Sequence, residues 1–305
     1  MCLAGLRAPF LAAANLLIIF SVNLVAQSTP VARSQGADLS TDRESAHRSP
    51  EWPSIAKHLP NPATASASDL EAEGDILRAR RFPEDAIDFY GYALSRGANV
   101  EEIDMKIGMT HLEMRHVALA RVYFQRVVKV NRKDATGWNN LGAVEYLNHD
   151  YKASINAYKR AVKLNDRSAT YHSNLGMAYF DSKDYKRSRQ ELTIALDLDP
   201  SVFSKGSSSG VSAQVLSPQD RARFCLEMAK TYVLLGDRSE MMHSLAMASE
   251  AGMDLMAEMS KDKVLARYLT DPEIPILIQN AKALRSGGTG VAEGETGSAA
   301  KPTAE

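Results

Sequence analysis

Glycine recurs at one fixed interval through the middle of this sequence. Gly74, Gly108, Gly142 and Gly176 are each 34 residues apart. Because a glycine inside a helix costs about 1 kcal/mol relative to alanine, four of them in register indicate a packing requirement. A 34-residue period is typical of helix pairs that stack into a solenoid. The interval therefore predicts an all-α fold whose usual role is to hold a partner.

Other side chains repeat in the same frame. The third repeat contains Trp138, Leu141, Tyr158 and Ala161, and the fourth contains Leu175, Tyr179, Leu192 and Ala195. This pattern resembles the tetratricopeptide repeat (TPR) over about residues 67–284. The resemblance implies a right-handed α-solenoid of helical hairpins with C-terminal capping helices, flanked by disordered segments.

The frame also divides the chain. Four repeats are expected over 67–100, 101–134, 135–168 and 169–200, a flexible inserted loop and the start of the next helix over 201–221, a fifth hairpin over 222–252, and capping helices over 253–285. The loop is inferred because the fifth repeat begins at 222 instead of 203. Compositions rich in Ser, Pro and Ala over 27–66, and in Gly over 286–305, predict a disordered linker and tail.

Residues 1–26 read as a targeting segment. Arg7 precedes an uncharged apolar stretch from Ala8 to Ala26, which predicts either a secretory signal peptide or a retained N-terminal anchor. Both alternatives place the remainder outside the cytoplasm, in the periplasm or secreted, with an inner-membrane tether only if the segment is uncleaved. A formal net charge of −1 with mixed signs argues against nucleic acid as a partner.

The TPR resemblance implies that the first helix of each hairpin lines a concave groove for a protein or peptide. The implied groove residues are Met105, Met109, Leu112, Asn139, Asn140, Tyr146, Ser173, Asn174, Met177 and Phe180. Their sulfur and aromatic surface suits a ligand with apolar anchors, and the two asparagines at equivalent positions, Asn140 and Asn174, suit an extended peptide backbone. The alternative is that these side chains pack against neighbouring helices. The basic clamp that chaperone-binding members use for a C-terminal carboxylate is absent.

Catalytic chemistry has little support in the sequence. His111 and Glu145 share one repeat position, where an ion pair or hydrogen bond at a half-buried seam is expected and a third metal ligand is missing. Cys225 lies among apolar residues and is expected to be buried, and Lys183, Lys186 and Arg187 are expected at a solvated turn. No nucleotide-binding, metalloprotease or nucleophile motif occurs. We expect neither enzyme activity nor a cofactor or metal.

The sequence therefore predicts a non-catalytic protein–protein interaction scaffold of the bacterial cell envelope. Its ligand would be a peptide or protein bound in the concave groove. The alternative is a structural homo-oligomer, assembled through the groove or the C-terminal helices.

Overall fold

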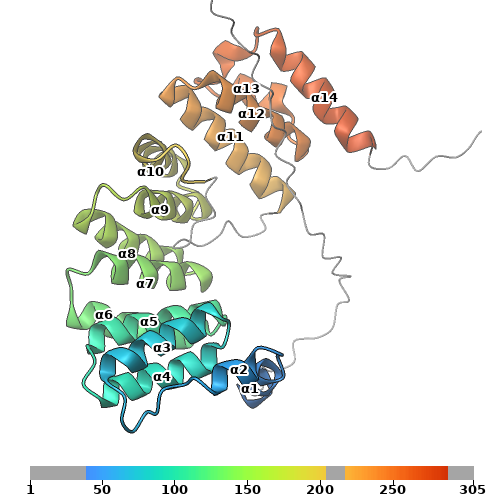
Figure 1. Cartoon of the computed structure of the whole chain (residues 1–305). Helices are drawn as coiled ribbons and strands as arrows, with labels where there is room; N and C mark the ends of the chain where they lie inside the picture. The colour runs from blue at the N-terminus through green and yellow to red at the C-terminus, as the bar shows by residue number, and fades with distance from the viewer. Residues whose placement is uncertain (1–38, 204–216, 288–305) are drawn as a thin grey trace, which may run out of the picture. The chain divides into compact units, whose positions relative to one another are not determined.

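The computed structural model of the protein describes residues 39–203 and 217–287 (Figure 1). The contacts described below lie within the compact unit Arg43–Glu305. Every regular element in the described ranges is a helix. The predicted signal peptide or anchor, most of the predicted inserted loop and residues 288–305 of the predicted tail lie outside the described residues.

Four consecutive helical hairpins form the middle of the chain. Their first helices are α3 (Ala67–Ala79), α5 (Val100–Glu113), α7 (Ala135–Leu147) and α9 (Ala169–Asp181), and their second helices are α4 (Pro83–Ser95), α6 (Val117–Val130), α8 (Tyr151–Leu164) and α10 (Tyr185–Leu198). Each helix packs on its hairpin partner, and the second helix of one hairpin packs on the first helix of the next (Figure 1). The predicted all-α solenoid of helical hairpins is confirmed.

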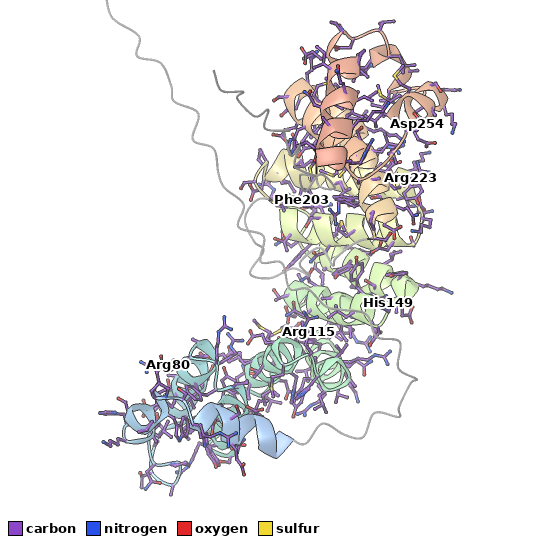
Figure 2. All side chains as sticks on the ribbon, turned by 90° about the vertical axis from the view of Figure 1, so that its right-hand side faces the viewer. Arg80, Arg115, His149, Phe203, Arg223 and Asp254 are labelled. Atoms are coloured by element: carbon purple, nitrogen blue, oxygen red, sulfur yellow. The ribbon has the colours of Figure 1, made fainter. Side chains whose placement is uncertain are left out.

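Local side-chain signals start and end these helices. Ser66, Asp134 and Ser168 each precede a first helix, and each side-chain oxygen accepts a hydrogen bond from a backbone N–H of the first turn, which has no partner inside the helix. The turn between the two helices of each hairpin holds one residue with positive φ, namely Arg81, Arg115, His149 and Lys183. These four positions also lie 34 residues apart, and Figure 2 labels Arg115 and His149 at successive turns.

The glycine interval has a direct packing cause. Gly74 lies against Tyr90, Gly108 against Phe124, Gly142 against Tyr158 and Gly176 against Leu192, and a Cβ built on each glycine would lie 2.5, 2.7, 2.6 and 2.7 Å from the facing side chain. Side chains do not tolerate such contacts, so only glycine lets the two helices of a hairpin cross this closely. At the third crossing, Ser154 Oγ also donates a hydrogen bond of 2.9 Å to the Gly142 carbonyl.

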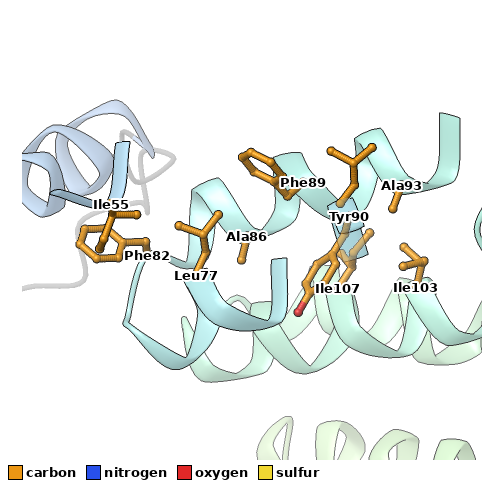
Figure 3. Packing of buried hydrophobic residues seen from close by; sticks show 10 residues of the cluster. Ile55, Leu77, Phe82, Ala86, Phe89, Tyr90, Ala93, Ile103 and Ile107 are labelled. Atoms are coloured by element: carbon orange, nitrogen blue, oxygen red, sulfur yellow. The ribbon is translucent and has the colours of Figure 1, made fainter. Parts of the chain in front are cut away.

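The segment before the first hairpin differs from the disordered linker expected through Ser66. It contains the helices α1 (Leu39–His47) and α2 (Trp52–Ala56). Ile55 is 7% exposed and packs in one cluster with Phe82 (Figure 3). The Phe82 ring lies 5.1 Å from that of Trp52. These side chains cover the start of the hairpin array, because the first repeat of a solenoid has no preceding neighbour to bury its apolar surface.

The helix that follows the fourth hairpin packs in the reverse direction to the one that a regular array would give, which we call reversed docking. α11 (Pro218–Leu235) packs on α10 with the two N-terminal ends together: Lys183 pairs with Asp220, Arg223 stacks over Tyr185, and Arg189 pairs with Glu227. Where α6 meets α7, by contrast, Arg121 in the first turn of α6 pairs with Glu145 near the end of α7. α11 and α12 (Arg238–Glu250) form the expected fifth hairpin. This hairpin does not continue the alternating helix direction of the first four.

Three further elements follow at the C-terminal side: α13 (Leu255–Lys261), the 3₁₀ helix η1 (Ala266–Tyr268) and α14 (Glu273–Gly287). Arg238 at the start of α12 binds Asp271 and Glu273 at the start of α14, while Arg285 near the end of α14 donates to the Ser249 carbonyl near the end of α12. α14 thus lies beside α12 in the same sense. Helices are present where capping helices were expected, with a 3₁₀ turn between them.

Candidate protein-binding surface

The first helices of the second, third and fourth hairpins are joined side by side through polar contacts one repeat apart. Asn140 Nδ2 donates to Met105 Sδ (3.3 Å), Thr136 Oγ1 lies 3.1 Å from Tyr171 OH, Asn174 Nδ2 donates to Asn139 Oδ1 (2.9 Å), and Tyr146 OH donates to Asp181. We call the face of α5, α7 and α9 that carries these residues the inner surface. It brings together the residues that the TPR resemblance assigned to the groove.

Half of the predicted groove residues are accessible on this surface and half are not. Met105, Met109, Leu112, Asn140 and Met177 are half-buried, whereas Asn139, Tyr146, Ser173, Asn174 and Phe180 are buried. The Asn139 and Asn174 side chains lie in the seam between α7 and α9: Asn139 Oδ1 accepts a hydrogen bond from Asn174 Nδ2, and Asn139 Nδ2 donates to Asn140 Oδ1 at 3.4 Å. The alternative of internal packing thus describes these two asparagines, and in part Met105, Met109 and Leu112, which pack against a buried cluster that contains Phe124. Asn140 is half-buried.

Phe180 is covered because of the reversed docking of α11. Its ring meets Phe224 of α11 edge to face at 5.3 Å and Tyr185 at 5.4 Å, and it is fully buried. In a regular array the next first helix would run alongside α9 and leave this position open to the groove. The inner surface therefore ends before Phe180.

His111 and Glu145 do not pair with each other. Glu145 is buried and accepts a hydrogen bond of 2.8 Å from Arg121 Nε. The His111 ring stacks on Tyr123 at 5.5 Å and lies 5.8 Å from that of His116. Two effects lower the pKa of His111: burial is the larger, and the neighbouring His116 is the second.

The described residues contain no group of three His, Cys, Asp or Glu side chains that could hold a metal ion. Cys225 is buried as expected, and burial raises the pKa of its thiol. One feature escaped the sequence analysis: the basic residues of the α9–α10 turn line a pocket against α11, which only the reversed docking creates.

Comparison with known proteins supports this repeat geometry. A TPR repeat model matches residues 144–183, and a tetratricopeptide repeat model matches residues 169–202. The chain contains tetratricopeptide repeats. No curated protein matches the sequence significantly.

Similar solved structures are TPR proteins or MamA proteins of low sequence identity. MamA from Desulfovibrio magneticus RS-1 (residues 41 to the end) is 17% identical, with a TM-score of 0.46, over 65% of this chain and 97% of that one. YrrB, described as a TPR protein with an unusual peptide-binding site, is 15% identical, with a TM-score of 0.44, over 70% and 97%. A thermophilic TPR protein from Thermus thermophilus is 16% identical, with a TM-score of 0.41, over 71% and 99%.

Proposed function

We propose that this TPR protein is a non-catalytic scaffold that binds a peptide or protein on its inner surface. The observation that carries the proposal is the half-buried part of that surface, which contains Met105, Met109, Leu112 and Met177 and the Asn140 amide, whose Nδ2 contacts Met105 Sδ. Methionine side chains adapt their shape to different apolar anchors, and a rigid helical frame holds them in place. A tetratricopeptide fold itself supports a role in protein–protein interaction.

Asn140 supplies the polar element that such a surface needs. Among the residues that the structure describes, its Nδ2 donates only to the Met105 thioether, at 3.3 Å, and sulfur is a weak acceptor. A backbone carbonyl of a bound extended peptide would be a stronger acceptor for the same N–H group. The amide would then orient the peptide while the methionines hold its apolar side chains.

A pull-down with paired variants tests the proposal. In Met109→Glu/Met177→Glu two carboxylates replace half-buried apolar side chains of the inner surface, and we expect loss of a partner that the wild type retains. The control Leu119→Glu/Val122→Glu makes the same change on α6, where these residues are 44% and 50% exposed, and should retain the partner. Equal recovery with both variants, with unchanged circular dichroism, would reject the inner surface as the binding site.

We further propose that the protein acts outside the cytoplasm. The support is the sequence of residues 1–26. Among the residues that the structure describes, no helix is both long and apolar enough to span a bilayer. Cell fractionation with N-terminal sequencing of the recovered protein tests the location: a mature chain that begins at Gln27 indicates cleavage, and recovery only from the cytoplasm contradicts the proposal.

Self-assembly is a second candidate function. The observation in its favour is α14, whose Ile276 and Leu284 are 58% and 66% exposed on the last helix. Burial of such side chains against a second copy would be favourable. Light scattering at increasing concentration distinguishes the two: a mass that stays monomeric removes this candidate, and a dimer that Ile276→Glu/Leu284→Glu abolishes supports it.

A further inference from the structure

A pocket of about 660 Å³ lies between the α9–α10 turn and α11. Five cationic side chains line it, namely Lys183, Lys186, Arg189, Arg223 and Lys230, together with two carboxylates, Asp184 and Glu227. Three further carboxylates, Asp220, Glu258 and Asp262, pair with lining cations from outside the pocket. The pocket depends on the reversed docking, which brings the N-terminal half of α11 to the start of α10. It is therefore separate from the surface that carries Met109 and Met177.

The floor of the pocket is a buried ionic network. The Glu227 side chain is 2% exposed and pairs with both Arg189 and Lys230, the latter at 2.9 Å. Lys230 Nζ, on a side chain 8% exposed, also lies 2.6 Å from Asp262. Low exposure strengthens these interactions and fixes the side chains, so the floor is preorganised and polar.

The mouth of the pocket has cations with unused hydrogen-bonding capacity. Lys183 meets Asp220 at 3.4 Å with both side chains about half exposed, a pairing worth little in water. Arg223 stacks over the Tyr185 ring at 5.3 Å and approaches Glu258 only to 3.6 Å. Within the described part of the chain, Lys186 forms no ion pair. An ammonium group has three N–H donors and a guanidinium has five, so most of these donors remain free for a ligand.

We propose that this pocket binds an oxyanion on a side chain of a peptide ligand, either a carboxylate or a phosphoryl group, between Lys183, Lys186 and Arg223. Charge complementarity and the charge-assisted hydrogen bonds of lysine and arginine carry the proposal. It rests on the proposed scaffold function only in taking the ligand to be a peptide. The site adds a preference for acidic or phosphorylated segments to the apolar preference of the inner surface.

Fluorescence anisotropy on the full chain tests the ligand chemistry. Three labelled peptides of equal length carry glutamate, glutamine or phosphoserine at the same positions in a glycine–serine background, without apolar anchors. We expect the glutamate or the phosphoserine peptide to bind at least about tenfold more tightly than the glutamine peptide, and the tighter of the two identifies the oxyanion. Raising the salt from about 0.1 M to about 1 M should weaken binding, because the Debye length falls from about 10 Å to about 3 Å.

Matched variants locate the site. Lys183→Gln/Lys186→Gln should lose about tenfold in affinity. Lys159→Gln/Lys163→Gln, which removes two exposed lysines from α8, should bind like the wild type. The proposal would be overturned if all three peptides bound with equal affinity, or if the pocket variant bound like the wild type. It would also be overturned if the α8 control lost as much affinity as the pocket variant while both variants kept the wild-type melting curve. Met109→Glu/Met177→Glu should leave the affinity for these peptides unchanged. The proposal for the pocket and the proposal for the inner surface can therefore be rejected independently of each other.

Discussion

At the scale of single residues, the helix crossings make the sharpest stability prediction. A Cβ on Gly142 would lie 2.6 Å from the buried Tyr158 ring, while a Cβ on Gly91 of α4 would have no neighbour within 4 Å. Gly142→Ala should lower the free energy of unfolding by about 1–3 kcal/mol despite its better helix propensity. Gly91→Ala should raise it by about 0.5–1 kcal/mol. Urea denaturation measures both, and stabilisation by Gly142→Ala would contradict the crossing geometry.

Two adjacent arginines provide a similar comparison at a hairpin turn. Arg81 has φ of +66°, which L-residues adopt at a cost of about 1–2 kcal/mol, whereas Arg80 has φ of −85°. Both side chains are exposed. Arg81→Gly should therefore stabilise the protein by about 1 kcal/mol, and Arg80→Gly should destabilise it slightly. Thermal unfolding of the two variants checks the prediction, which fails if both shift the melting temperature in the same direction.

His111 should make stability depend on pH. Because burial and His116 lower its folded-state pKa below the usual 6.5, the folded state binds its proton less readily than the unfolded state. The favourable contribution of the neutral His111 side chain to the free energy of unfolding is therefore complete above pH 6.5, and it declines as the pH falls below that value. Denaturation between about pH 7.5 and pH 5 should show a flatter pH profile of the free energy of unfolding for His111→Phe than for the wild type. Equal slopes for the two proteins would contradict the prediction.

At the scale of helices, the sequence predicted the repeat hairpins well and the N-terminal helices poorly. Periodic glycines and caps such as Ser66 and Asp134 act locally, so they are visible in the sequence. α1 and α2 are short and lack a sustained apolar period. They are stabilised by contacts of Trp52 and Ile55 with the first hairpin, which no local pattern reveals.

The α10–α11 seam should unfold first when its buried carboxylate is removed. Glu227→Ala leaves Arg189 and Lys230 without their shared partner, at a cost of about 3 kcal/mol. Hydrogen exchange should accelerate in α11, α12 and α14 while α5 to α9 keep their protection. Asp197→Ala, at an exposed site on α10, is the control and should change neither region. Equal loss of protection throughout the array would show that the seam is no weaker than the hairpin contacts.

At the scale of the whole array, the direction of α11 could not be predicted from the sequence. The shifted frame indicates an insertion, but α10 is 14 residues long, or about 21 Å, and a chain of the inserted length can reach either of its ends. Ion pairs that are distant in the sequence, such as Arg189–Glu227, select one end. The groove residues were inferred for a regular array. The unpredicted direction of α11 therefore explains why Phe180 was expected to be accessible and is buried.

Zero-length crosslinking tests this direction in the intact protein. A carbodiimide joins amines to carboxylates in direct contact, and Lys183 Nζ lies 3.4 Å from Asp220 at the start of α11. A helix that continued the alternation would instead bring its end, next to Asp237, towards Lys183. Mass spectrometry should therefore find a Lys183–Asp220 link and no Lys183–Asp237 link, with Lys106–Glu71 at 2.7 Å as the positive control. The reverse result would restore a regular fifth hairpin, remove the cationic pocket and uncover Phe180, so one measurement decides which surfaces the array offers to a ligand.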